Sequence, residues 1–403
     1  MTLSPETQAP VAIIGGGPSG LTFARLLEVN HIDYILYERD INSEPEFVNQ
    51  GGTLDIHASS GQLALKEAGL SEKFRTLARW DATRVCMQNP SGTVEAVFGE
   101  ERDAPEIDRL QLRKMLLDSI PAHKIRWGHS LKFVEKGGSP AAHFLRFANG
   151  NSASGFRLIV GADGAWSKIR SLLTKAKPEY SGKVFIEGSI SRDNQSYAIA
   201  SDHAGPGLML AMGQTKMLAV QQLSDRSYRF YMGIDAPEHL YKKKSTIADT
   251  ETMRQKFLSS PDFFADWSAK LRGYLANVEG PFHAWPLYRL PVSSLSWKRV
   301  SGVTLLGDAA HLSTPLVGEG VNMAMLDALM LIRSIMKHDV FGEVGGDMEM
   351  DCALSEYEQE MFERGTDHIS RCIGREEEFF AEHSAEDFVN KINSGMGAGG
   401  NDM

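Results

Sequence analysis

Short apolar runs and helical periodicity alternate at the start of the chain. Residues 11–14 (Val-Ala-Ile-Ile) carry no polar side chain, which is typical of a strand buried on both faces. After a run of glycines, Leu21, Ala24 and Leu27 recur at helical spacing, and residues 33–37 are again strand-like. Strand, glycine turn, helix and strand within about 30 residues predict a βαβ unit.

The pattern changes between residues 183 and 235. This stretch contains four strand-like segments, at 184–190, 208–212, 217–222 and 228–234. Because short polar turns join them, we expect an antiparallel sheet inside an otherwise α/β chain.

Buried strands are also expected at residues 157–160 and 303–306. Periodicity predicts helices at 110–120, 250–259, 261–275, 320–337 and 351–383. The strand near residue 305 has the character of the first strand of the chain. We therefore expect it to complete the N-terminal sheet, so that two domains interleave rather than follow one another.

Composition narrows the class of protein. A length of 403 residues suits two domains, and a net charge of -10 argues against a nucleic-acid partner. Cys86, Cys352 and Cys372 are too few and too scattered for a disulfide framework or a metal site, so we expect no metal. The chain starts without a signal-peptide pattern and has no apolar segment long enough for a membrane. We expect a cytoplasmic protein.

The first motif is the glycine turn of residues 15–20 (GGGPSG). Gly15 permits a tight turn, Gly17 permits a close approach of a pyrophosphate, and Gly20 permits close packing of the helix on the strand. Glu38 ends the second strand, where a carboxylate accepts hydrogen bonds from a ribose. A glycine turn without a ligand is the alternative. On these residues alone the motif indicates a dinucleotide and does not say which.

Two further motifs follow buried strands. Residues 161–170 (GADGAWSKIR) form a tight turn with Ser167 at the start of a helix, and an ordinary strand-to-helix connection explains them equally well. Residues 307–311 (GDAAH) place Asp308 where a ligand hydroxyl would meet it, and residues 318–322 (GEGVN) offer main-chain N–H groups. The alternative for this third motif is a capped helix start.

The three motifs in this order resemble the single-component (class A) FAD-dependent monooxygenases of the para-hydroxybenzoate hydroxylase fold. The resemblance covers residues from about 10 to 385. Within that family, residues 51–57 (GGTLDIH) and 106–113 (EIDRLQLR) are most similar to the tetracycline-inactivating monooxygenases.

The resemblance implies a fold and a division of the chain. The fold is α/β, with a Rossmann-type FAD-binding domain interleaved with an antiparallel-sheet substrate domain, plus a long C-terminal helix. The expected boundaries are 10–75, 100–175 and 285–340 for the FAD-binding domain, 76–99 and 176–284 for the substrate domain, 350–385 for the helix and 395–403 for a disordered tail.

The resemblance also implies roles for individual residues. The pyrophosphate of FAD would lie on the glycine turn, the ribose on Glu38 with Arg39 beside it, and the flavin's pyrimidine edge on the main chain of residues 318–322. The cofactor-binding residues expected in full are Gly15, Gly17, Ser19, Gly20, Glu38, Arg39, Asp55, Arg113, Asp163, Asp308, Gly318 and Val321. Without the family, Arg113 would be interpreted as a solvated helix residue and Asp55 as a loop acid.

The substrate half departs from the tetracycline enzymes. An arginine that contacts their nicotinamide is replaced around Val48, and their substrate glutamine and arginine fall at Glu187 and Gly207. The aromatic residue that follows Pro315 becomes Leu316. A further loop glutamine is Glu319. We expect Glu187, Pro315 and Leu316 to contact the substrate, and tetracycline is not expected to be the natural one.

The activity implied by the resemblance is oxygen insertion. Tightly bound FAD would be reduced by transient NADPH or NADH, O₂ would add, and a flavin hydroperoxide would transfer one oxygen to a small polycyclic or aromatic substrate. No protein acid or base is required, so no catalytic residue is assigned; a histidine placed like His311 is more often structural. We expect a monomer. The alternatives are a related FAD-dependent reductase and a catalytically silent flavin-binding module.

Overall fold

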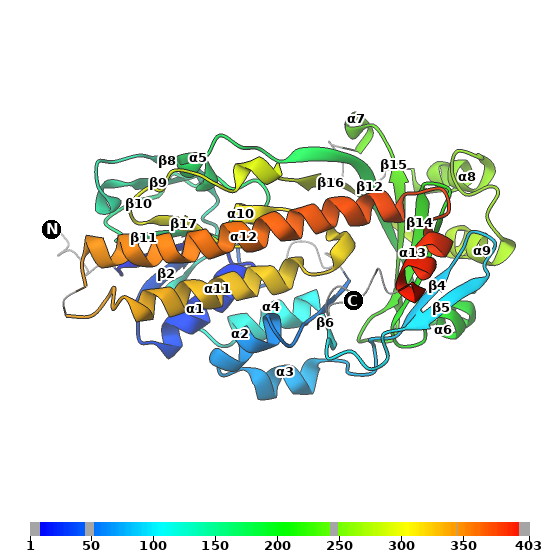
Figure 1. Ribbon diagram of the computed structural model, residues 1–403, viewed down its shortest axis with the longest axis horizontal. Helices are drawn as coiled ribbons and strands as arrows, with labels where there is room; N and C mark the ends of the chain where they lie inside the picture. The colour runs from blue at the N-terminus through cyan, green and yellow to red at the C-terminus, as the bar shows by residue number, and fades with distance from the viewer. Residues whose placement is uncertain (1–8, 45–51, 242–248, 344, 395–403) are drawn as a thin grey trace.

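The computed structural model describes residues 9–44, 52–241, 249–343 and 345–394. Its helices and strands form an elongated molecule with one main sheet in each half (Figure 1). Among the described helices, none has the length and apolarity needed to cross a membrane. The expected positions Val48 and Gly51, and the tail 395–403, lie outside the described residues.

The first sheet is wholly parallel, and its central strands carry only apolar side chains. Its order is β17 (Val303–Leu305), β11 (Leu158–Gly161), β1 (Val11–Ile14), β2 (Tyr34–Tyr37) and β7 (Ile125–Arg126). The strand near residue 305 therefore does complete the N-terminal sheet. The two domains interleave in the chain as the resemblance implied, and the α/β fold class is confirmed.

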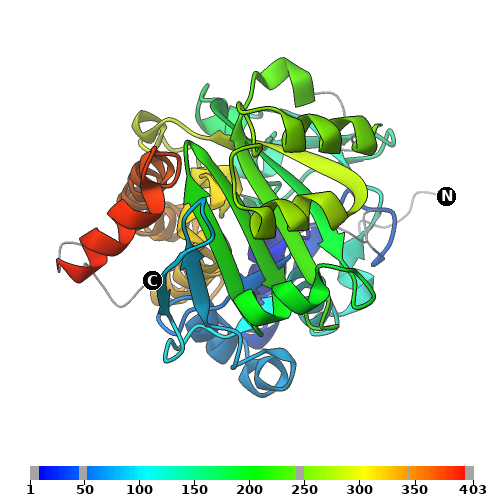
Figure 2. The ribbon, with the colours of Figure 1, turned by 90° about the vertical axis from the view of Figure 1, so that its right-hand side faces the viewer.

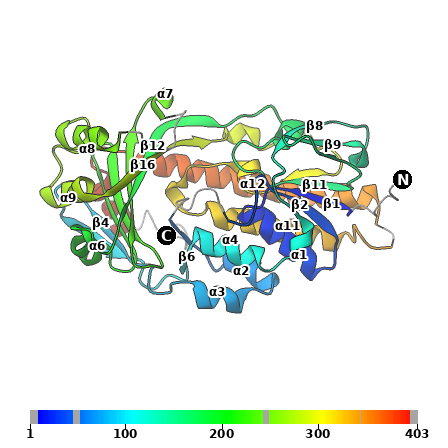
Figure 3. The same ribbon diagram turned by 180° about the vertical axis from the view of Figure 1, so that it is seen from behind.

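Helices and a small sheet cover the two faces of the parallel sheet (Figures 1 and 3). The helices are α1 (Pro18–Val29), α2 (Gly61–Glu67), α3 (Ser71–Leu77), α4 (Arg109–Leu117) and α11 (Gly320–Lys337). The small antiparallel sheet contains β8 (Leu131–Glu135), β9 (Phe144–Phe147) and β10 (Ser152–Ala153). Tyr37 of β2 stacks on Phe147 of β9 with ring centroids 4.7 Å apart, which joins this small sheet to the parallel one.

The second main sheet has seven strands and is antiparallel except for one parallel pair, β13 with β4. Its order is β16 (Glu279–Arg289), β12 (Glu179–Ile190), β15 (Tyr228–Asp235), β14 (Lys216–Gln222), β13 (Leu208–Gly213), β4 (Val85–Gln88) and β5 (Val94–Phe98). The four strands expected between 183 and 235 are all present. Gln214 and Thr215 turn the β13–β14 hairpin with φ of 52° and 60°.

Helices cover the outer face of this sheet (Figure 2). They are α6 (Tyr197–Ala204), α8 (Thr250–Ser259) and α9 (Ala269–Asn277), with the short α7 (Glu238–Tyr241) nearby. The helix expected at 261–275 is wrong over its first half, because the segment 261–267 forms turns. There Phe264 and Trp267 pack edge to face inside the core, and Ser268 caps α9 by accepting a hydrogen bond from Leu271 N–H.

The long helix α12 (Asp347–Phe379) runs along both halves and is followed by α13 (Ser384–Asn393), which the sequence pattern did not predict (Figure 1). At the junction of the two halves lies a two-stranded sheet of β3 (Thr53–Asp55) and β6 (Glu106–Asp108). One link to the seven-stranded sheet is Arg79, which lies 2.6 Å from a Glu106 oxygen and donates to the carbonyls of Pro206 and Gln222.

This link generates a stability prediction. Arg79→Met should lower the free energy of unfolding by about 3 kcal/mol, because it leaves a buried carboxyl group and two carbonyls without their donor. The matched control is Arg75→Met, which removes an exposed ion pair with Glu72 and should cost less than about 1 kcal/mol. Urea denaturation measures both. Equal costs for the two variants would contradict the structural role of Arg79.

Candidate functional site

The glycine turn between β1 and α1 leaves an open cradle at the helix N-terminus. A Cβ at Gly15, where φ is 112°, would lie 2.2 Å from the Ala162 oxygen, and one at Gly20 would lie 2.0 Å from the Gly15 oxygen. Both positions therefore require glycine. A Cβ at Gly17 would meet nothing within 4 Å, and the first turn of α1 carries no acidic side chain. This cradle suits an anionic group.

Asp40 connects Glu38 and Arg113 at the end of β2. The buried Glu38 carboxylate accepts hydrogen bonds from Gly16 N–H and, at 3.0 Å, from Asp40 N–H. Arg113 of α4 lies 2.9 Å from the Asp40 carboxylate, whereas Arg39 is exposed beside it. The structure thus brings the expected ribose carboxylate and the expected arginine to one edge of the cradle.

The second and third motifs lie side by side, because β11 and β17 are neighbouring parallel strands. Asp163 accepts a hydrogen bond from Lys168 N–H at 2.7 Å, and its Oδ1 is buried without a hydrogen-bond partner in the described part of the chain. The buried Arg170 guanidinium donates to the Ala309 oxygen at 3.0 Å and to the Ala165 oxygen at 2.6 Å. Arg170 therefore holds the two motifs in one arrangement.

Asp308, at the start of α10 (Asp308–His311), is the free carboxylate of this arrangement. Its side chain is solvent-accessible, although surrounding protein desolvates it and raises its pKa. A Cβ at the preceding Gly307 would lie 3.4 Å from the Ser19 hydroxyl, so the first and third motifs are also in contact range. Asp308 forms no side-chain hydrogen bond or ion pair with any other described residue, which leaves it available to a ligand.

His311, by contrast, faces the interior. Its Nε2 lies 2.5 Å from an Asp327 oxygen, and the other oxygen of Asp327 lies 3.3 Å from an Arg364 nitrogen. Both His311 and Asp327 are buried. This geometry supports the structural interpretation of His311 over a catalytic one.

Asn322 ties the segment after Gly52 to the start of α11. Its side chain accepts from His57 N–H at 2.8 Å and donates to the Asp55 oxygen at 2.8 Å. The Asp55 carboxylate itself pairs with Arg102 at 2.8 Å, a partner that the sequence did not single out. Asp55 can reach a cofactor only alongside that arginine.

The loop before α11 is held from the C-terminal helix. Gly318, with φ of 79°, ends the 3-10 turn Pro315–Val317, and the next residue, Glu319, receives both guanidinium nitrogens of Arg371 at 2.8 and 2.6 Å. His368 lies 3.4 Å from the same carboxylate. The Glu319 carboxylate is therefore paired with two cationic side chains on α12. Gly320 and Val321 begin α11, and their N–H groups form no hydrogen bond within the helix.

The inner face of the seven-stranded sheet lies opposite this loop. Leu316 is buried there against Leu210, Met217 and neighbouring apolar side chains, while Pro315 is exposed. Glu187 of β12 is buried on the same face. A Cβ at Gly207 would lie only 2.1 Å from the Arg84 oxygen, so no side chain fits at this position.

Three residues near the expected site, two on β15 and one on α4, were not among the site residues expected from the sequence. Arg229 and Tyr231 alternate with the buried Tyr228 and Phe230, so their period of two already indicated a second, polar face of this strand. A Cβ at Gly52 would lie 2.3 Å from the Tyr231 hydroxyl, which shows how closely the two halves approach. Arg109 is exposed one helical turn before Arg113, a spacing that places both on one face.

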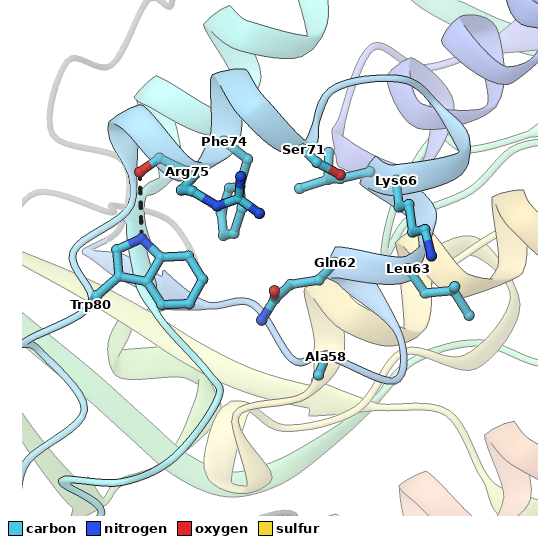
Figure 4. A pocket seen from close by; sticks show the side chains of 9 residues that line it. Ala58, Gln62, Leu63, Lys66, Ser71, Phe74, Arg75 and Trp80 are labelled. Carbon is cyan, nitrogen blue, oxygen red and sulfur yellow. Dashed lines mark hydrogen bonds between the residues drawn. The ribbon is translucent and has the colours of Figure 1, made fainter.

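A separate cavity of about 290 Å³ lies between α2 and α3 (Figure 4). Figure 4 shows the side chains of Gln62, Lys66, Arg75 and Trp80 around it. None of the expected site residues lines this cavity.

Known proteins share both the sequence pattern and the fold. Residues 8–262 and 284–348 match the family model described as FAD binding domain. Monooxygenase asqM of Emericella nidulans is 28% identical over 413 residues, covering 90% of this chain and 93% of its own. The solved structure of Klebsiella pneumoniae HpxO with FAD and uric acid superposes with a TM-score of 0.73 at 22% identity, over 96% of this chain and 92% of that one. Tetracycline destructase Tet(55) superposes with a TM-score of 0.70 at 17% identity, over 98% and 96%.

The pair of Glu319 and His368 generates a pH prediction. Burial opposes both charges, but the nearby His368 and the hydrogen bonds from Arg371 lower the pKa of Glu319 from 4.5 to about 2. Hydrogen bonds with Cys372 and Glu319 raise the pKa of His368 from 6.5 to about 9. The stabilisation from the raised histidine is complete below pH 6.5 and lost as pH rises through 9, and that from the lowered glutamate is complete above pH 4.5 and lost as pH falls through 2.

Glu319→Gln should therefore cost about 2 kcal/mol of unfolding free energy near pH 6 and less near pH 10, where His368 is neutral in both proteins. Urea denaturation at the two pH values measures the difference. Exposed Glu363 on the same helix provides the control, since Glu363→Gln should change stability by less than about 0.5 kcal/mol at either pH. A cost for Glu319→Gln that does not change with pH would contradict the pairing.

Proposed function

The chain belongs to the FAD binding domain family and is an FAD-dependent monooxygenase, and from this premise we propose that it uses NADPH or NADH to insert one oxygen atom of O₂ into a small, ring-bearing organic substrate. The observation that carries the proposal is the meeting of three motifs around one open cradle. The glycine turn, Asp163 and Asp308 come from distant parts of the chain and lie together at the ends of β1, β11 and β17.

The residues present fit FAD. The open cradle at Gly17 suits the pyrophosphate, and Glu38 retains lone pairs for a ribose hydroxyl. The unpartnered Asp163 oxygen and the accessible Asp308 carboxylate are acceptors for further hydroxyl groups. Arg39, Asp55, Arg113, Gly318 and Val321 complete the proposed set, together with Gly15, Ser19 and Gly20. Bound FAD supplies hydride acceptance from a nicotinamide and activation of O₂.

This chain's own contribution is to position the substrate and to exclude water. The inner face of β13 and β14 is apolar, and Leu316 packs against it from the loop before α11. A site between that face and the cradle would hold a flat substrate in a water-poor space. A ring-bearing substrate is consistent with the uric acid bound to HpxO. In the same proposal, the nicotinamide nucleotide binds transiently, and the enzyme is a cytoplasmic monomer.

The proposal is tested on the purified, yellow holoprotein. A substrate found in a panel of polycyclic phenols and alkaloids should accelerate NADPH oxidation and O₂ uptake in equal amounts, and the product should gain one ¹⁸O atom from ¹⁸O₂. Turnover of that substrate without O₂ would instead indicate a reductase. Failure of both NADPH and NADH to reduce the flavin would indicate a binding module.

Asp308 gives a second, more local prediction. Asp308→Ala should weaken FAD binding about 10- to 100-fold, because it removes a charged hydrogen-bond acceptor from the cradle. Flavin content after gel filtration measures the loss, and circular dichroism shows that the variant is folded. Asp308→Asn keeps the size of the side chain, and exposed Asp193→Ala is the control that should retain FAD. Full flavin content in both Asp308 variants would refute this assignment.

A further inference from the structure

Two buried charged side chains on the inner face of the seven-stranded sheet each keep an atom without a hydrogen bond. The Glu187 carboxyl group does have a hydrogen-bonding contact with Trp285. Glu187 on β12 is 2% exposed and Arg229 on β15 is 8% exposed. Glu187 Oε1 and Arg229 Nε form no hydrogen bond, and neither side chain is in a salt bridge within the described parts of the chain. They are close enough for Arg229 to lower the pKa of Glu187, against the larger effect of burial, which raises it.

The register of the strands places the two side chains on one face. Glu187 pairs with Tyr231, and Ser189 pairs with Arg229, in the antiparallel ladder of β12 and β15. Glu187 and Arg229 are therefore diagonal neighbours, whose Cβ atoms lie about 7–8 Å apart in such ladders. His283 of β16 faces Glu187 from the other side, and Trp285 also lies on this face. Two long side chains at this spacing can converge on one edge of a flat ring.

Two other arginines with little solvent exposure show how this pair differs. Arg79 is bonded to Glu106 and two carbonyls, and Arg170 is bonded to carbonyls of the second and third motifs. A buried charge without such partners is strongly unfavourable unless a ligand completes its hydrogen bonds. Glu187 and Arg229 also lie on the face across from the proposed cofactor cradle, where a substrate would be held.

We propose that Glu187 and Arg229 recognise a flat cyclic amide, whose N–H donates to Glu187 and whose adjacent carbonyl accepts from Arg229. The inference rests on the proposed function, because it names the substrate class of the same site. A neutral lactam matches the pair, since one carboxylate and one guanidinium leave no net charge to neutralise. A carboxylic acid would satisfy Arg229 but place its own negative charge beside Glu187.

Three bicyclic probes of related shape test the proposal on the FAD-loaded protein. These probes are 2-quinolone, which has both groups, N-methyl-2-quinolone, which lacks the donor, and coumarin, which has a ring oxygen in place of the N–H. Kd values come from the change in flavin absorbance on titration. The wild type should bind 2-quinolone about tenfold or more tightly than either analogue.

Variants then separate the two recognition groups. Glu187→Leu should reduce the preference for the donor-bearing probe to near unity, while Glu187→Gln, which keeps an acceptor oxygen, should retain part of it. Arg229→Met should weaken all three carbonyl probes about tenfold and preserve their order. Exposed Arg192→Met is the control and should change nothing. Flavin content and the flavin spectrum without probe should stay the same in every variant.

The outcomes distinguish this inference from the proposed function. Equal Kd values for the three probes in the wild type, or no binding of any of them, would overturn the lactam site. Persistence of the preference in Glu187→Leu would overturn the role of Glu187. If the preference is found but nicotinamide nucleotides do not reduce the flavin, the lactam site stands and the proposed use of NADPH or NADH fails.

Discussion

The site depends on one buried cation. Arg170 is buried, and an unpaired guanidinium would be strongly unfavourable there. It donates to the Ala165 carbonyl after β11 and to the Ala309 carbonyl after β17. Because these carbonyls belong to the second and third motifs, the cation that needs them also fixes their relative position. The cradle at α1 then meets a surface whose geometry is already set, which is the condition for binding a cofactor without rearrangement.

Sequence patterns predicted the helices and strands whose formation depends on neighbouring residues in the chain. The βαβ unit and α11 follow from side-chain periodicity, and α11 begins and ends at the expected residues. The short strands β3 and β6 were not predicted, since each is only three residues long and depends on pairing with the other. The region around Trp267 resembled a helix because its apolar spacing is helical, but tertiary packing of the aromatic rings prevailed there.

The candidate site shows the same division. Motifs placed the cofactor residues, because glycine and carboxylate positions around a turn are a local property. Partners could not be predicted, since Arg102 beside Asp55 and the cations on α12 beside Glu319 are brought there by the fold alone. The burial of Arg229 could not be predicted, because a single charged residue in a strand does not show whether its side chain faces solvent or the interior.

The tight packing at Gly207 has an evolutionary consequence. A side chain there would collide with main-chain atoms of residues 82 and 84, which cannot rotate away as a side chain can. A single substitution at residue 207 therefore cannot add a recognition side chain unless the main chain shifts, so a new side chain for substrate recognition has to come from neighbouring strands of the sheet.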